Sequence, residues 1–129
     1  MKKLLFILTL LSGLSVGQTN FVSNSSFETY TACAHPLMSN ITNWASYFTG
    51  SSDAFNICIT PTYSYMGVPS NIFGFESPHS GNGYCGFGTY EVGFSNAQEF
   101  LRTKLTSTLV AGKTYSLTFF VSLSDSSSY

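Results

Sequence analysis

The fold is decided by the run Lys113-Thr-Tyr-Ser-Leu-Thr-Phe-Phe-Val-Ser-Leu-Ser-Asp125. Large apolar side chains occupy every second position of this run: Tyr115, Leu117, Phe119, Val121 and Leu123. Hydroxyl-bearing residues alternate with them, and only Phe120 breaks the pattern. A period of two, built from aromatic and aliphatic residues, predicts a β-strand with one buried and one solvated face. We therefore expect an antiparallel sheet whose apolar face packs on a second sheet.

Few residues follow this predicted strand, only those from Ser126 to Tyr129. A strand this apolar needs paired neighbours and a facing sheet. We therefore expect either that it lies at a sheet edge or that the natural protein continues beyond it. Our interpretation is a secreted all-β module that is incomplete at its C-terminus.

The first residues have the features of a secretory signal peptide. Lys2 and Lys3 precede an apolar run that ends at Leu14, and Ser15-Val16-Gly17 supplies the small residues of a cleavage site. The run is too short to cross a bilayer, so a signal peptide over residues 1–17 is favoured over a buried helix. Residues 18–129 are long enough for one domain, which we expect to be secreted or on the cell surface, outer membrane or extracellular, with no membrane span.

The composition argues against one class of partner and suits another. After residue 17, Arg102, Lys104 and Lys113 are the only basic residues, against six acidic ones. Without a basic stripe, nucleic acid is not an expected partner. Charged residues make up 9% of the chain and aromatic residues 16%, so the surface is wetted mainly by hydroxyl and amide groups. Such a surface suits neutral polar ligands such as glycans.

Three cysteines occur in a chain that is expected to reach an oxidising compartment. Cys33 and Cys58 both lie in loop-like sequence, and we predict a disulfide between them. Cys85 lies in a predicted strand, where it would serve as a small buried apolar residue. A zinc site is disfavoured because no CxxC motif occurs and neither His35 nor His79 is spaced as a paired ligand.

Short strand-like segments are separated by turns along the rest of the chain. Strands are expected at 20–22, 26–30, 43–47, 84–90 and 98–105, with turns at 50–53, 80–83 and 110–113. Residues 59–78 are predicted to form a long irregular loop. A loop of this length in a compact domain is usually functional. This arrangement predicts a β-sandwich or jelly roll.

Several of these stretches together resemble a known kind of module. The matching pieces are Asn24-Ser-Ser-Phe-Glu28, Asn43-Trp44, Val68-Pro69, Phe73-Gly74-Phe75, Pro78-His79-Ser80-Gly81-Asn82-Gly83-Tyr84 and Leu105-Thr-Ser-Thr-Leu-Val-Ala-Gly-Lys-Thr-Tyr115. In this order they resemble secreted Bacteroidetes-type jelly-roll modules, which are similar to carbohydrate-binding and galactose-binding-like domains. The resemblance implies a two-sheet antiparallel jelly-roll sandwich with further strands after Asp125. It also implies further domains of the same polypeptide, because relatives of this kind are larger surface or secreted proteins.

Catalysis is not expected from the residues present. A Ser–His–acid set could draw on His35 or His79 with Asp53, but no nucleophile elbow accompanies them. Pairs of carboxylates of the glycosidase type could come from Glu28, Glu76, Glu91 or Glu99. Two carboxylates in one cleft are expected by chance, so we predict that the module is not an enzyme.

Two interpretations are open for the role of Glu28, and two for the role of His79. The resemblance implies a structural calcium ligand at Glu28, since similar jelly rolls often place one there, and calcium takes carboxylate and carbonyl oxygens. The alternative, which we favour, is an exposed glutamate at a strand end. For His79 we favour a hydrogen-bonded structural side chain over a metal ligand. No cofactor is predicted apart from this structural calcium.

The ligand surface that we prefer is the loop from Tyr63 to Phe75, where aromatic rings alternate with small polar residues. Such a mixture is typical of binding sites. The residues that we predict to bind ligand are Trp44, Tyr63, Tyr65, Asn71 and Phe73. The alternatives are that the loop rings only cover an open end of the sandwich and that Trp44 anchors the core.

Three functions follow from these patterns. The first is a non-catalytic module that binds carbohydrate or another polar surface ligand through its loop aromatics. The second is a structural or adhesive spacer in a larger surface protein. The third is an N-terminal accessory part of a secreted hydrolase.

Overall fold

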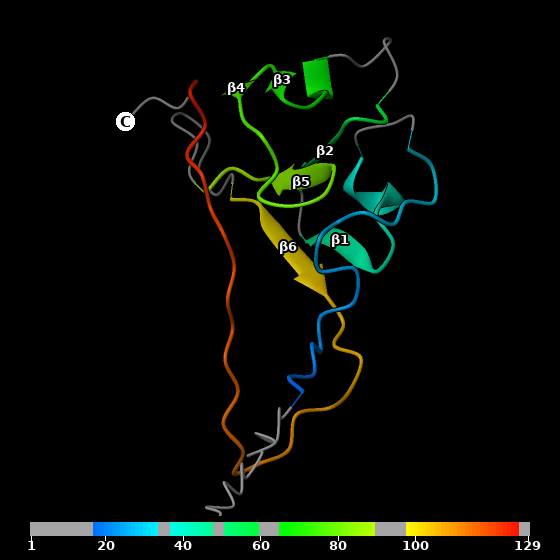
Figure 1. The fold of residues 1–129 in the computed structure, drawn as a ribbon, viewed down its shortest axis with the longest axis vertical. Helices are drawn as coiled ribbons and strands as arrows, with labels where there is room; N and C mark the ends of the chain where they lie inside the picture. The colour runs from blue at the N-terminus through cyan, green and yellow to red at the C-terminus, as the bar shows by residue number, and fades with distance from the viewer. Residues whose placement is uncertain (1–16, 34–36, 48–50, 60–64, 90–97, 127–129) are drawn as a thin grey trace, which may run out of the picture.

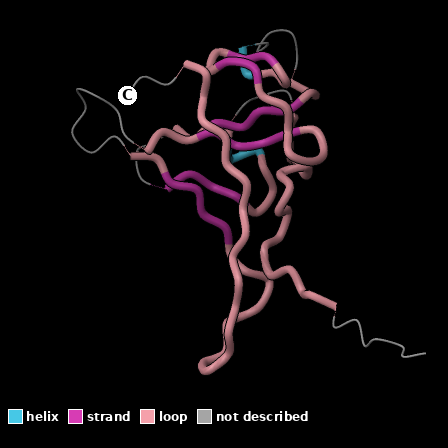
Figure 2. The backbone as a smooth tube through the Cα atoms, turned by 60° about the vertical axis from the view of Figure 1, so that its left-hand side comes forward, coloured by secondary structure: helices cyan, strands magenta, loops and turns pink. Residues whose placement is uncertain are grey.

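The computed structural model describes residues 17–33, 37–47, 51–59, 65–89 and 98–126 of the 129-residue chain. This part of the chain forms six short strands, which are β1 (Trp44–Tyr47), β2 (Asp53–Asn56), β3 (Ser70–Asn71), β4 (Gly74–Phe75), β5 (Gly83–Gly86) and β6 (Phe100–Thr103). They pair as three two-stranded antiparallel sheets, β1–β6, β2–β5 and β3–β4. The pairs follow one another along the long axis of the molecule (Figures 1 and 2). The predicted all-β class and the antiparallel pairing are confirmed.

A short 3-10 helix, η1 (Met38–Asn40), accompanies the strands, and Tyr65 and Met66 also have 3-10 conformation. No helix among these residues is long and apolar enough to cross a membrane. The signal peptide predicted for residues 1–17 lies outside the described residues except for Gly17.

The buried centre of the molecule is built on β2. Ala54 and Phe55 are almost completely enclosed, and they pair with Cys85 and Tyr84 of β5. The Phe55 ring stacks on the Tyr84 ring with their centroids 5.0 Å apart. β2 was not predicted because its polar ends and buried centre do not alternate in the period of two that marks a half-exposed strand.

A small apolar cluster extends this centre toward η1 and β1. Its buried members are Met38, Ile41 and Ala54. Larger, half-buried side chains pack around them: Phe27, Tyr30, Trp44, Cys85 and Leu101. Removing such apolar surface from water contributes about 25 cal/mol per Å² of buried area, so these residues hold η1, β1, β5 and β6 together.

The pair β1–β6 confirms two predicted strands, those at 43–47 and 98–105, with shorter bounds. Trp44 pairs with Thr103 and Tyr47 with Phe100. The predicted strand at 84–90 is present as β5, which begins at Gly83. The opening segments predicted as strands at 20–22 and 26–30 contribute only isolated bridges, Val22 to Leu105 and Tyr30 to Ile41. The turn between these two opening segments is closed by Asn24, whose side chain forms hydrogen bonds with the backbone of Thr29 and Thr42.

Two predicted turns are present, and each uses a glycine with positive φ. Gly81 has φ of 72° and Gly112 has φ of 78°. L-residues with a Cβ rarely adopt this conformation, so glycine lets the chain reverse at both points without steric cost.

The prediction for the stretch 113–125 is wrong. It belongs to no strand, and its residues from 114 to 125 donate and accept no backbone–backbone hydrogen bond with the described part of the chain. The segment runs as a long extended trace beside the strand pairs (Figure 1, orange to red). The side chains expected in the core are exposed: Tyr115 by 40%, Leu117 by 77%, Phe119 by 70%, Val121 by 76% and Leu123 by 60%.

Both faces of this segment are largely exposed, and side chains of the face that was predicted to be solvated make contacts with the body of the molecule. Ser122 donates a hydrogen bond to the Glu76 carboxylate (2.7 Å), and Ser124 donates one to the Phe73 carbonyl (2.7 Å). Phe120, the residue that broke the alternation, stacks on His79. The apolar face has no neighbouring strand or second sheet among the described residues, and it therefore faces water.

Candidate binding surface

The loop that the sequence marked as a ligand surface contains the β3–β4 hairpin. Its central side chain is Asn71, whose amide nitrogen donates to the Tyr84 hydroxyl (2.6 Å) and to the Gly67 carbonyl (3.3 Å). The amide oxygen of Asn71 accepts the Phe73 N–H (2.9 Å). These three bonds fix the hairpin turn and attach it to β5.

The final segment of the described chain holds the other side of the hairpin. The Phe75 N–H donates to the Asp125 carboxylate (2.8 Å), and the Ser126 N–H donates to the Phe73 carbonyl (3.2 Å). The Phe73 ring also packs edge-on against the buried Phe55, with centroids 5.8 Å apart. The hairpin is therefore attached to β5 on one side, to the final segment on the other side, and to the buried Phe55 ring beneath it.

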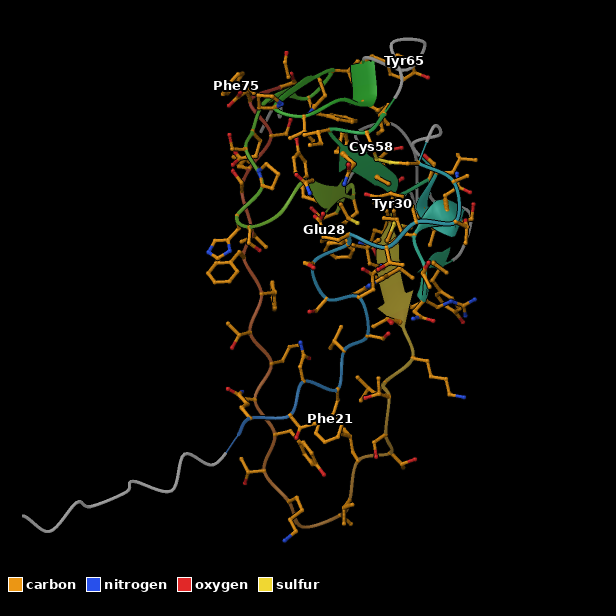
Figure 3. All side chains as sticks on the ribbon, turned by 45° about the vertical axis from the view of Figure 1, so that its right-hand side comes forward. Phe21, Glu28, Tyr30, Cys58, Tyr65 and Phe75 are labelled. Atoms are coloured by element: carbon orange, nitrogen blue, oxygen red, sulfur yellow. A yellow bond between two sulfur atoms is a disulfide. The ribbon has the colours of Figure 1, made fainter. Side chains whose placement is uncertain are left out.

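A set of apolar side chains remains exposed on this hairpin and the turn before it. The exposed fractions are 46% for Tyr65, 54% for Ile72, 40% for Phe73 and 66% for Phe75. We call these four residues the aromatic hairpin surface. Tyr65 and Phe75 lie at the same end of the molecule (Figure 3).

The structure brings some of the predicted ligand residues together and separates others. Tyr65 and Phe73 belong to the aromatic hairpin surface, whereas the amide group of Asn71 forms the hydrogen bonds that hold the turn. Tyr63 lies outside the described residues. Ile72 and Phe75 lie in the predicted loop but were not named among its ligand residues, although they flank the predicted Phe73.

Trp44 lies at a distance from this surface, on β1, with the β2–β5 pair in between (Figure 1). Its indole N–H donates to the Asn24 carbonyl (2.9 Å), and its ring packs on Phe27 with centroids 4.7 Å apart. The ring is half-buried against the core cluster. Of the two readings left open for Trp44, this geometry suits the core anchor, and a ligand contact there stays a prediction.

A shallow, open pocket of about 330 Å³ lies beside Trp44 on the β1–β6 pair. Its lining consists of Asn43, Trp44, Ala45, Arg102, Thr103 and Lys104. The Thr103 hydroxyl donates to the Asn43 carbonyl (2.8 Å), and the Arg102 guanidinium lies over the Tyr47 ring, 4.9 Å from its centroid. The side chains of Thr103 and Arg102 are therefore engaged with their own neighbours.

Glu28 acts as an acceptor for the turn that begins β5. One of its carboxylate oxygens accepts the N–H groups of Asn82 (2.7 Å) and Gly83 (3.1 Å), and the other accepts the Asn82 side-chain amide (3.0 Å). Within the described residues, no group of three or more His, Cys, Asp or Glu side chains could hold a metal ion. The calcium site at Glu28 stays a prediction, and the observed role of the carboxylate is to fix the turn.

Burial shifts the protonation equilibria of several groups near the core. It raises the pKa of Asp53 to about 6, with a further contribution from the nearby Glu99 carboxylate. It raises the pKa of Tyr30 to about 12, and it also raises the pKa values of Tyr84 and the Cys85 thiol. In each case desolvation disfavours the charged form.

The Glu99 carboxylate has its own structural partners. It accepts the N–H of Ser51 (2.7 Å) on one oxygen and the N–H of Gly88 (2.7 Å) on the other. These bonds join the segments before β2 and after β5.

Cys33 and Cys58 form the disulfide predicted for them, with their Cα atoms 5.9 Å apart. Cys85 is the free thiol, and its sulfur lies 3.6 Å from that of Met38 in the core.

Comparisons of the chain with family models, curated proteins and solved structures give no match. The function is therefore inferred from the residues of the chain and their contacts.

Proposed function

We propose that this protein is a secreted or cell-surface, non-catalytic module that binds carbohydrate or another polar surface ligand through the aromatic hairpin surface. The observation that carries the proposal is the exposure of four large apolar side chains, three on a hairpin that is held by hydrogen bonds on both sides and Tyr65 on the turn before it. Exposed apolar groups gathered at one end of a molecule are typical of interaction sites.

The chemistry of this surface suits a sugar ring. The C–H faces of a pyranose are apolar and pack against aromatic rings, as Tyr65 and Phe75 would allow, while the sugar hydroxyls require polar neighbours. Ser70, Glu76 and Ser77 are exposed around the hairpin and supply hydroxyl and carboxylate groups. A few polar groups around an apolar centre is the usual composition of a small-molecule site.

The finer fold and the location belong to the same proposal. We infer a jelly-roll, galactose-binding-like sandwich, which is supported by the antiparallel pairs and by the sequence resemblance. Secretion is supported by the predicted signal peptide and by the Cys33–Cys58 disulfide, since disulfides persist in oxidising compartments.

Retention on immobilised polysaccharides and a glycan array test the binding role. We expect that Phe75→Ala and Tyr65→Ala each weaken retention about 10-fold, because each variant removes an exposed ring whose apolar surface a bound sugar would cover, at about 25 cal/mol per Å². The matched control is Phe87→Ala, which removes a ring of similar exposure (47%) outside the hairpin. Melting temperatures should stay within about 2 °C of wild type for all three variants.

Two results would contradict the binding role. One is the absence of retention on every glycan by a folded sample, which would favour the structural or adhesive spacer. The other is equal loss of retention in Phe87→Ala and Phe75→Ala, which would show that the hairpin is not the site.

A further inference from the structure

The segment from Lys113 to Asp125 has an extended backbone that ends in a turn at Asp125, and it is anchored at both ends. At one end the Tyr115 ring packs edge-on against Phe21, with centroids 5.9 Å apart, and the Tyr115 hydroxyl accepts the Val110 N–H (2.9 Å). At the other end Asp125 accepts the Phe75 N–H (2.8 Å). Phe21 and Phe75 lie toward opposite ends of the described chain (Figure 3), so the segment spans most of its length.

Two features of this segment are those of an unpaired sheet edge. Its backbone N–H and C=O groups from residue 114 to residue 125 make no backbone–backbone hydrogen bond with described residues. Its outward side chains, Leu117, Phe119, Val121 and Leu123, are 60–77% exposed. An extended, apolar and unpaired strand is a template for pairing with another strand.

We propose that the segment pairs with the same segment of a second copy of this chain, antiparallel and centred on Phe119. The charges select this partner and this register. When Phe119 faces Phe119 of the second copy, Lys113 of each chain comes opposite Asp125 of the other, because both lie six residues from the centre. Asp125 lies in the turn that ends the segment and keeps one carboxylate oxygen on the Phe75 N–H, so the Lys113 ammonium would approach an acceptor that is already held in place. Opposite charges directly across an antiparallel pair are favourable, and no other charged residue lies between them.

The same register places like side chains opposite one another. Tyr115 faces Leu123 and Leu117 faces Val121, so the outward apolar face is continuous across both copies. Ser116 faces Ser122 on the other side. A shift by one residue would oppose apolar and polar residues, and a shift by two would separate Lys113 from Asp125. The arrangement has two-fold symmetry and closes after two copies.

Sedimentation velocity of the full chain across a range of concentrations tests the pairing. We expect a monomer–dimer equilibrium, and we expect Phe119→Lys to raise the dimer Kd about 100-fold, because it places two like charges face to face on the symmetry axis. The matched control is Ile57→Lys, which alters a residue of similar exposure (60%) outside the segment and should leave Kd unchanged. Circular dichroism confirms that each variant is folded.

A charge exchange tests the register. Lys113→Asp opposes two aspartates at each end of the pair, and Asp125→Lys opposes two lysines, so each variant alone should dimerise weakly. A mixture of the two variants restores an opposite-charge pair at both ends and should form a heterodimer more tightly than either variant pairs with itself.

Cysteine cross-linking distinguishes this pairing from other occupants. Phe119→Cys should form an intermolecular disulfide, because the Cβ atoms of facing residues lie about 4.5–5.5 Å apart. Leu117→Cys alone should not cross-link, but mixed with Val121→Cys it should. A monomer at every concentration would overturn the proposal, as would an unchanged Kd in Phe119→Lys. Self-cross-linking of Leu117→Cys, which indicates parallel in-register stacking, would also overturn it.

Discussion

The Phe120 ring lies flat on the His79 ring, with centroids 3.5 Å apart and an angle of 13° between the ring planes. These residues come from the final extended segment and from the turn before β5. The contact joins the middle of the segment to that turn at the surface of the molecule, because the Phe120 side chain is 67% exposed. For His79 the structure shows this stacking contact, and the hydrogen bond expected from the sequence stays a prediction.

Removing the Phe120 ring should loosen the middle of the segment without unfolding the protein. We expect Phe120→Ala to lower the backbone order parameters of residues 118–122, since this ring is the one aromatic contact with the body between Tyr115 and Asp125 in the described chain. The measurement is ¹⁵N relaxation by NMR. Phe119→Ala is the matched control, and an equal effect of both variants would contradict the stacking role.

This segment shows which structural features an alternating pattern of apolar and polar residues can and cannot predict. Alternation of apolar and polar residues correctly predicts an extended backbone, because that period does not fit a helix. It does not determine which face is buried, because that depends on partners supplied by distant residues. Here Glu76 and the Phe73 carbonyl accept hydrogen bonds from the serines, and no second sheet among the described residues covers the apolar side chains.

The hydrogen bonds of Glu28 should contribute measurably to stability. We expect Glu28→Ala to lower the free energy of unfolding by about 1–3 kcal/mol, because it leaves the N–H groups of Asn82 and Gly83 without their acceptor. Urea denaturation measures the change. Glu28→Gln is the graded control, which keeps an oxygen acceptor and should lose less.

The same variants separate the turn-fixing role of Glu28 from the predicted calcium site. A calcium ligand would make the melting temperature of the wild type, but not of Glu28→Ala, fall on addition of EDTA. The hydrogen-bonding role alone predicts that the loss in Glu28→Ala is the same in calcium and in EDTA.

The disulfide between Cys33 and Cys58 closes a loop with a sequence separation of 25 residues. A loop of that size constrains the unfolded chain, so we expect Cys33→Ser to cost about 3 kcal/mol of stability. Thermal denaturation with and without a reducing agent measures the effect. A melting temperature unchanged by both the variant and the reductant would contradict a stabilising role for the bond.

The protonation of Asp53 should make stability depend on pH. Its pKa is about 6 in the folded protein and about 3.8 when unperturbed. Folding therefore favours the protonated form, and the stabilisation is full below about pH 4 and is lost as the pH rises through about 6. Asp53→Asn should remove this dependence and gain on the order of 1 kcal/mol at pH 7, a value reduced for the partial solvent screening of a half-buried group.

Denaturation curves at pH 3.5, 5 and 7 measure this dependence for both proteins. Wild type should lose stability between pH 4 and pH 6 relative to Asp53→Asn. Parallel curves for the two proteins over that range would contradict a raised pKa for Asp53.

The candidate site was only partly visible in the sequence. Aromatic density identified the loop that contains Tyr65 and Phe73, because irregular sequence rich in rings is rarely disordered. It did not reveal the internal hydrogen bonds of Asn71, since these depend on the positions of Gly67 and Tyr84, and a ligand contact of Asn71 stays a prediction. Trp44 is similar, because its exposure depends on whether Phe27 packs against it.

The most direct measurement is an NMR search for cross-peaks between the ring protons of His79 and those of the final segment. The orientation of that segment underlies both the support of the hairpin by Asp125 and the pairing through Phe119. We expect strong cross-peaks from His79 to Phe120 and none to Phe119. Cross-peaks from Leu117, Phe119 and Val121 to buried core residues, without any from His79 to Phe120, would contradict the account.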